Sequence, residues 1–80
     1  SLVLRMTVEK VVKELGIDAE VENTDLSTAK ATPADVYFTS FELQQELEKT
    51  IKAPIYPIKK YMDVNEVREQ FKRYLASKGE

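Results

Sequence analysis

The sequence predicts an α/β domain with an open parallel sheet flanked by helices. Patterns typical of helices and of strands alternate along all 80 residues, which implies parallel strands joined by right-handed crossovers. Only three strand patterns are found, and two of them are typical of sheet edges. The first helix also has a broad apolar face, as helices that follow a strand have in such folds. We therefore expect one domain over residues 1–80 whose sheet includes a further strand outside them.

The first helix is predicted from apolar side chains that recur at helical spacing, namely Leu4, Val8, Val11, Val12 and Leu15. Gly16 is expected to end this helix, because glycine readily adopts the left-handed conformation, and Ile17 can then fold back onto the last turn. Residues 19–23 alternate polar and apolar side chains around Val21, which predicts an edge strand.

A short helix and a buried strand are predicted next. Asp25 or Ser27 is placed to cap a helix of one or two turns that runs through Lys30. The continuous apolar run Val36, Tyr37 and Phe38 then predicts a strand over residues 36–39 that is covered on both faces. We expect this strand to be central in the sheet.

The second half repeats the pattern of helix, strand and helix. Ser40 is placed to cap a helix whose narrow apolar stripe is Leu43, Leu47 and Ile51. Residues 55–58 predict a strand, and Pro57, which has no N–H to donate, places that strand at an edge or ends it.

The last helix has the clearest start signal. Asp63 followed three residues later by Glu66 predicts a capping box. The expected inner face is Val64, Val67, Phe71, Tyr74 and Leu75, and Gly79 marks the end of the helix.

Composition excludes several classes of function. The 12 Lys and Arg residues nearly balance the 14 Asp and Glu residues and alternate with them, so no basic surface for nucleic acid or an anionic membrane is expected. The absence of Cys and His excludes thiolate zinc sites, a cysteine nucleophile and a histidine base within these residues. No metal or cofactor is predicted. No apolar stretch is long enough to span a membrane, so a cytoplasmic protein is expected.

Five stretches together resemble the enzyme IIB component of the bacterial phosphoenolpyruvate-dependent sugar phosphotransferase system, and most closely its ascorbate-type branch. The resemblance lies in their order and spacing, because each stretch alone fits many small α/β domains. They are SLVLRM (residues 1–6), VEK (8–10), LGIDAEVE (15–22), DLSTAK (25–30) and ADVYFTS (34–40). They cover most of the chain, and the resemblance is weakest after Ile51.

The family resemblance implies a four-stranded parallel sheet of order 2-1-3-4 and a reactive cysteine at the end of strand 1. That cysteine lies in a loop resembling Cys-Gly-x-Gly-x-Gly-Ser-Ser, receives a phosphoryl group from the IIA component and passes it to a sugar held by the IIC component. Ser1 matches the final Ser of the loop, so strand 1 and the cysteine are expected before Ser1. Three explanations are considered: strand 1 exists in the protein but lies outside residues 1–80, the chain is a true fragment, or the chain is an inactive descendant. The first is favoured, because a protein that had lost this strand would have unpaired backbone groups inside its sheet.

The N-terminus of the first helix is the first candidate site. Unpaired N–H groups and a partial positive charge at such an end favour a bound dianion and lower the pKa of a nearby thiol. Ser1 and Leu2 are therefore candidate phosphate-binding residues, with an ordinary helix cap as the alternative for Ser1. Arg5 is one turn further on, where a solvated helix residue is favoured over an anion ligand.

The carboxyl ends of the strands are the second candidate site, because ligands of open parallel sheets bind in the crevice there. Thr24, Thr39 and Ser40 are the candidate crevice residues, although a helix cap is favoured as the main function of Ser40. Lys59 and Lys60 could pair with an acidic partner surface, but a solvated loop is the favoured interpretation. The aromatic residues are interpreted as core, and the acidic pairs are assigned no chemistry.

Two functions are carried forward from the sequence. The first is a phosphoryl carrier whose partners are the IIA and IIC components and a sugar, peripheral to a membrane transporter, with neither nucleic acid nor stable membrane insertion nor a required oligomer. The second is a non-catalytic α/β interaction or regulatory module, motivated by the absence of Cys and His.

Overall fold

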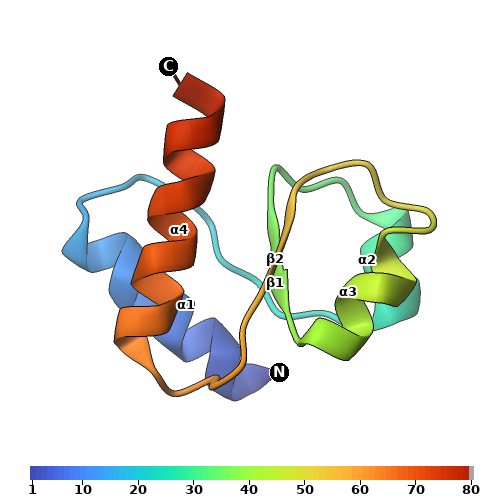
Figure 1. Ribbon diagram of the computed structural model, residues 1–80, viewed down its shortest axis with the longest axis horizontal. Coiled ribbons are helices and arrows are strands. Elements are labelled where there is room, and N and C mark those ends of the chain that lie inside the picture. Colours follow the sequence, from blue (N-terminus) through green and yellow to red (C-terminus); the bar gives the residue numbers. More distant parts are fainter. Residues whose placement is uncertain (80) are drawn as a thin grey trace.

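A computed structural model describes residues 1–79 as a small parallel sheet between two pairs of helices (Figure 1). Two helices, α1 and α4, lie on one side of the sheet, and α2 and α3 lie on the other. The elements are α1 (Leu2–Glu14), α2 (Leu26–Ala31), β1 (Tyr37–Thr39), α3 (Phe41–Leu47), β2 (Ile55–Pro57) and α4 (Val64–Gly79). The predicted α/β class is confirmed.

The sheet consists of β1 and β2, paired in parallel with Phe38 opposite Tyr56. The Ile58 N–H donates to the Thr39 carbonyl at 2.7 Å, directly after β2 has ended at Pro57. β2 ends at Pro57 as predicted, although the ladder to β1 continues to the Ile58 N–H. Because successive N–H groups of a strand point to opposite edges, the Pro57 nitrogen faces away from β1, toward the edge where β2 has no strand neighbour among the described residues. Within the described residues β1 has β2 as its single neighbour, so its central position remains a prediction.

Gly16 ends α1 as expected. Its φ is +68°, its N–H donates to the Lys13 carbonyl at 3.1 Å, and the Ile17 N–H donates to the Val12 carbonyl at 3.0 Å. These two bonds form a Schellman motif, which satisfies carbonyls that the helix leaves open. Ile17 also packs against the core, so the motif fixes the direction in which the chain leaves α1.

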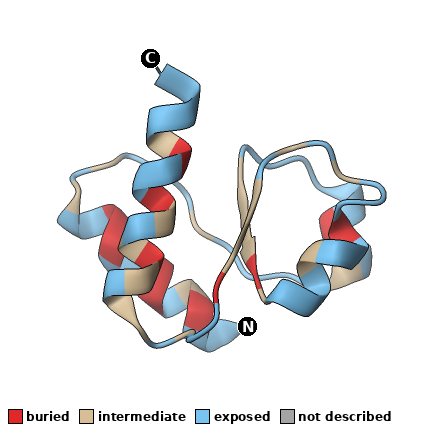
Figure 2. Ribbon diagram, viewed as in Figure 1, coloured by how far each residue is buried: buried red, intermediate tan, exposed pale blue. Residues whose placement is uncertain are grey.

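The main hydrophobic core lies between α1, α4 and the residue that follows β2. Its most deeply buried side chains are Val11, Val67 and Ile58, each at most 1% exposed. Figure 2 shows the buried positions of α1 and α4 turned toward each other. Phe38 of β1 extends this core, because its ring stacks on Phe71 of α4 with the ring centres 5.4 Å apart. The inner face predicted for α4 is confirmed.

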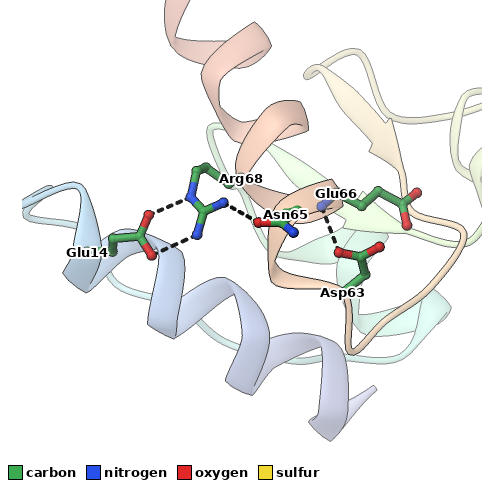
Figure 3. A network of polar contacts seen from close by, with 5 residues as sticks. All are labelled: Glu14, Asp63, Asn65, Glu66 and Arg68. Carbon is green, nitrogen blue, oxygen red and sulfur yellow. Dashed lines mark hydrogen bonds and ion pairs between the residues drawn. The ribbon is translucent and has the colours of Figure 1, made fainter.

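An ion pair joins the outer surfaces of α1 and α4 (Figure 3). The Arg68 guanidinium donates to both carboxylate oxygens of Glu14, with one of the two bonds at 2.9 Å, and also to the Asn65 side chain at 2.7 Å. The hydrogen bond from Arg68 lowers the pKa of Glu14, and it raises the pKa of Arg68. Because the Arg68 and Glu14 side chains are 23% and 45% exposed, water screens their attraction, and this pair orients the helices more than it stabilises them.

The strand predicted over residues 19–23 is wrong, because the structure has no strand there. A strand requires a hydrogen-bonded neighbour, and no backbone hydrogen bond between this segment and β1 or β2 is formed. Val21 nevertheless packs against the core, so the alternating pattern identified the inward side chain correctly. The predicted strand order requires that this segment does not pair directly with β1, and the structure shows no hydrogen bond between the two backbones.

Two details of the helices also differ from the predictions. The helix after Ser40 ends at Leu47, so Ile51 lies outside it, and Leu43 is 43% exposed. Leu47 is buried while Gln44, one turn earlier, donates to the Ile55 carbonyl at 3.4 Å, so the face toward β2 is partly polar. Half of the predicted capping box is present, because Asp63 accepts from the Glu66 N–H at 3.1 Å, but Glu66 has other partners.

Candidate functional site

The carboxyl ends of both strands and the N-termini of three helices lie at one end of the molecule (Figure 1). Thr39 ends β1 immediately before the cap of α3, and the loop after β2 leads to the cap of α4. The N-terminus of α1 lies at this end as well. We call this surface the strand-end face and define it as residues 1–6, 39–43 and 58–63. In open parallel sheets, ligands bind at this end.

Ser1 is the N-cap of α1. Its hydroxyl accepts from the Leu4 N–H at 3.4 Å, and its carbonyl accepts the first intrahelical bond, from the Arg5 N–H, at 3.0 Å. The N–H groups of Leu2 and Val3 precede that bond and have no partner within the helix. The capping interpretation of Ser1 is confirmed, and phosphate binding by Ser1 and Leu2 stays a prediction.

The first turn of α1 differs from those of α3 and α4 in its charge. The first turns of α3 and α4 carry Glu42 and Glu66, whereas that of α1 contains no acidic side chain. An acidic residue in the first turn neutralises the partial positive charge of the helix end. Among these three helices, α1 is therefore the one whose N-terminus keeps its attraction for an external anion.

Arg5 is tied to neighbouring residues. Its Nη1 donates to the Asn23 side-chain oxygen at 3.0 Å, and its Nε donates to Glu9 at 3.4 Å. These contacts place Asn23, at the end of the expected strand, beside the first turns of α1. The interpretation of Arg5 as a helix surface residue is supported, while its link to Asn23 was not predicted.

Thr24 lies on the surface beyond this contact. It is exposed, and its hydroxyl donates to the Asp25 carbonyl at 3.4 Å. Asp25 caps α2 by accepting the Thr28 N–H at 2.7 Å, and this backbone hydrogen bond lowers the pKa of the Asp25 carboxyl. Asp25, rather than Ser27, is therefore the cap of α2. Thr24 belongs to the turn before this helix, and its proposed place in a crevice stays a prediction.

Thr39 and Ser40 are adjacent at the end of β1, but they differ in exposure and contacts. Thr39 is 8% exposed, and its carbonyl receives the Ile58 N–H described above. Ser40 is half-buried and accepts the Leu43 N–H at 3.1 Å, which makes it the N-cap of α3. The preferred interpretation of Ser40 as a helix cap is confirmed.

Glu66 holds the loop between β2 and α4. Its carboxylate accepts the Lys59 N–H at 2.6 Å and the Lys60 N–H at 2.8 Å, while both lysine side chains are exposed. On the other side of the loop, the Thr7 hydroxyl of α1 donates to the Tyr61 carbonyl at 2.6 Å. The loop is thus fixed to both α1 and α4, and no sequence signal linked Thr7 to it.

Large exposed hydrophobic side chains are concentrated on the strand-end face. Residues 1–79 expose six of them, and all lie in the first turns of α1 and α3 or in the loop after β2. They are Leu2, Val3, Met6, Phe41, Leu43 and Met62. A concentration of this kind is typical of surfaces that bind other proteins.

Neither a metal site nor a membrane span is found in the part of the chain that the structure describes. Residues 1–79 bring together no group of three or more carboxylates that could hold a metal ion. In the same residues no helix is both long and apolar enough to cross a bilayer.

The fold and this face define the chain as a small α/β domain with its candidate site at the carboxyl ends of a parallel sheet. The chain belongs to the family described as "PTS system, Lactose/Cellobiose specific IIB subunit", whose model matches residues 1–73. It is similar to an ascorbate-specific PTS system EIIB component of Mycoplasma pneumoniae, with 32% identity over 77 residues that cover 94% of this chain and 81% of the relative. No solved structure matches the chain significantly. The predicted resemblance is confirmed, and the chain is a component of a sugar phosphotransferase system.

Proposed function

We propose that this protein is a phosphoryl carrier between the IIA and IIC components of one transport system. A cysteine thiolate N-terminal to Ser1 attacks phosphorus of a phosphohistidine on IIA, and the P–N bond breaks as the P–S bond forms. A sugar hydroxyl oxygen bound by IIC then attacks the same phosphorus and loses its proton, and the thiolate leaves. Membership of the IIB family supports this reaction.

The single observation that carries the proposal is the N-terminus of α1. Its first turn lacks an acidic residue, and the Leu2 and Val3 N–H groups have no partner in the helix. Such an end stabilises a thiolate and a phosphoryl dianion through its N–H groups and partial charge, and this effect falls off within one turn. Ser1 and Leu2 contact the phosphoryl group in this proposal, and Thr24, Thr39 and Ser40 border the crevice around it.

A further strand of the sheet accompanies the reactive loop in this proposal. It precedes Ser1 and lies along the free edge of β1, between β1 and residues 19–23. In the structure residues 19–23 form no strand, and in this proposal they become strand 2 only by pairing with the added strand, which gives the order 2-1-3-4. Two observations support it: β1 has one strand neighbour among the described residues, and no backbone hydrogen bond joins residues 19–23 to β1. Backbone groups inside a sheet require partners, which this strand supplies.

The carrier meets its two partners in turn through the strand-end face. Successive docking requires contacts that are small and reversible, and the exposed apolar side chains of this face are available for them. The proposed location is cytoplasmic, peripheral to the membrane-embedded IIC component. On addition of IIA, chemical-shift changes are expected at residues 2–6, 24–27 and 39–41, and changes confined to α4 would contradict this docking.

Intact mass spectrometry of the complete protein tests the function. Incubation with phosphoenolpyruvate, the general phosphotransferase proteins and IIA should add one phosphoryl mass with the lability of a thiophosphate. Replacement of the cysteine before Ser1 by serine should abolish the gain. Without any gain in the unmodified protein, the carrier function is rejected in favour of a non-catalytic interaction module, which the absence of Cys and His from residues 1–80 also favours.

A further inference from the structure

We propose that the outer edge of β2, the edge turned away from β1, is closed to strand addition by side chains from both layers of helices, and that this closure prevents two copies of the protein from pairing edge to edge. The closing groups are the amides of Gln44 and Gln70, the ring of Pro57 and the carboxylate of Glu66. Edge closure of this kind is independent of the phosphoryl chemistry of the proposed function.

The register of the sheet decides which backbone groups of β2 face outward. The Pro54 carbonyl accepts the Tyr37 N–H of β1 at 3.0 Å, and the Ile58 N–H donates to β1 at 2.7 Å. Because the backbone groups of successive residues in a strand point to opposite edges, the even-numbered residues of this stretch face β1. The backbone groups of Ile55 and Pro57 therefore face the outer edge.

Both outward carbonyls of β2 are capped by glutamine side chains. Gln44 Nε2 of α3 donates to the Ile55 carbonyl at 3.4 Å, and Gln70 Nε2 of α4 donates to the Pro57 carbonyl at 2.8 Å. Both glutamines are half-buried, and their helices lie on opposite sides of the sheet (Figure 1). An incoming strand would therefore compete with an amide at each carbonyl and would meet a side chain on each face of the edge.

The same edge offers few donors. Pro57 has no N–H, and the next N–H on this side, that of Lys59, donates to the Glu66 carboxylate at 2.6 Å. Over residues 55–59 this leaves the Ile55 N–H as the donor for an incoming strand. A ladder requires donors and acceptors at regular intervals along both strands, so one donor is not enough to hold a further strand on β2.

The free edge of β1 has no such closure. Phe38 is the residue of β1 whose backbone groups point away from β2, and within residues 1–79 no hydrogen bond occupies its N–H or its carbonyl. The two edges of one small sheet therefore differ, since β1 is open to a further strand and β2 is closed. A closure confined to one edge, and made from two layers of helices, is a specific feature of this fold.

A second copy of the protein is the partner that an open β2 edge would attract. Unpaired backbone groups along an edge strand are a template for pairing with another chain. Every copy carries the same edge, and two identical edges can pair antiparallel about a two-fold axis. Each closing group acts twice in such a pair, because both copies contribute it. The closure therefore ends the sheet at β2 and leaves the domain without a self-complementary edge.

Opening the edge in the complete protein tests the proposal against a matched control. The open variant combines Gln44→Ala, Gln70→Ala and Pro57→Val, which removes both amides and restores an N–H on the outer edge. The control variant combines Gln45→Ala with Pro54→Val. Gln45 is an exposed glutamine of the same helix as Gln44, and the backbone groups of Pro54 face β1, so neither change opens the outer edge.

Analytical ultracentrifugation over a range of concentrations measures self-association, and amide hydrogen exchange of Ile55 reports pairing at this edge. The open variant is expected to associate with a dissociation constant at least about tenfold below the limit for the unmodified protein, because each restored backbone bond contributes twice to the pair. The Ile55 amide should become protected as the concentration rises. Pro57→Val alone should show a weaker effect, and the control variant should behave as the unmodified protein does.

Edge closure is rejected if the open variant stays as monomeric as the unmodified protein, or if the control variant associates to the same extent. It is also rejected if association leaves the exchange of the Ile55 amide unchanged, or if the unmodified protein already pairs through β2. Should circular dichroism show that the open variant does not fold, the pair Gln70→Ala, Pro57→Val is judged by the same measurements. None of them involves phosphoryl transfer, so their outcome leaves the proposed function to its own test.

Discussion

Glu66 offers a direct test of how the strand-end face is held together. Its carboxylate accepts two backbone N–H groups of the loop, at 2.6 and 2.8 Å, and the residue is half-buried. Hydrogen bonds to a charged group contribute about 1.5–3 kcal/mol each when they are shielded from water. Here water can reach the loop and replace part of the bonding. We therefore expect Glu66→Ala to lower the free energy of unfolding by about 1–2 kcal/mol.

Urea denaturation and amide hydrogen exchange measure the two consequences of this substitution. The exchange of the Lys59 and Lys60 amides should accelerate more than that of the Phe71 amide in the middle of α4, because the loop opens before the helices separate. Glu66→Gln should lie between the two proteins, since its amide retains one acceptor oxygen. Glu69→Ala is the matched control, because Glu69 is an exposed glutamate of the same helix. Unchanged stability together with unchanged exchange at Lys59 and Lys60 would show that the carboxylate does not hold the loop.

Two further predictions concern the core and the pH dependence of stability. Ile58 is 1% exposed in the core shared by α1 and α4, so Ile58→Ala should lower the free energy of unfolding by about 2–5 kcal/mol and Ile58→Val by about 0.5–1.5 kcal/mol, both measured in urea. Equal effects of the two substitutions would contradict this packing. The lowered pKa values of Glu14 and Asp25 mean that their stabilisation is complete above the ordinary carboxyl range of about 4, and is lost as the pH falls through the lowered values. Unfolding measured between pH 6 and pH 2 should therefore show a fall in stability at the acidic end, with a shallower slope in the double variant Glu14→Gln, Asp25→Asn. An unchanged slope would show that these two carboxylates are not linked to folding.

The features that the sequence predicted correctly depend on neighbouring residues along the chain. Capping by Asp25, Ser40 and Asp63 follows from a short polar side chain placed within reach of an N–H three residues later. The end of α1 at Gly16 is equally local, because it requires only one left-handed residue. The inner face of α4 follows from helical periodicity over four turns.

The features that the sequence did not predict depend on contacts between distant segments. Residues 19–23 have the alternation of a strand, but whether a strand forms is decided by a neighbouring strand. Glu66 satisfied the capping-box pattern, and the fold directs its carboxylate to Lys59 and Lys60. The attachment of the loop after β2 to α1 was not predicted either, because it is made by a hydrogen bond between residues that are 54 positions apart, from Thr7 to Tyr61.

The core and the binding surface of this domain use almost entirely different side chains. The most deeply buried residues, Val11, Val67 and Ile58, lie between α1, α4 and the end of β2, whereas the large exposed apolar residues lie at the starts of α1 and α3 and in the loop after β2. Burial of apolar area is the main source of stability, so an exposed side chain such as Met62 contributes little to folding. Substitution of Met62 should therefore change docking while the free energy of unfolding stays within about 0.5 kcal/mol of the original value. Thr7 is the exception, because it is buried and its hydroxyl also holds the loop that carries Met62, so a variant at this position would change stability and docking together.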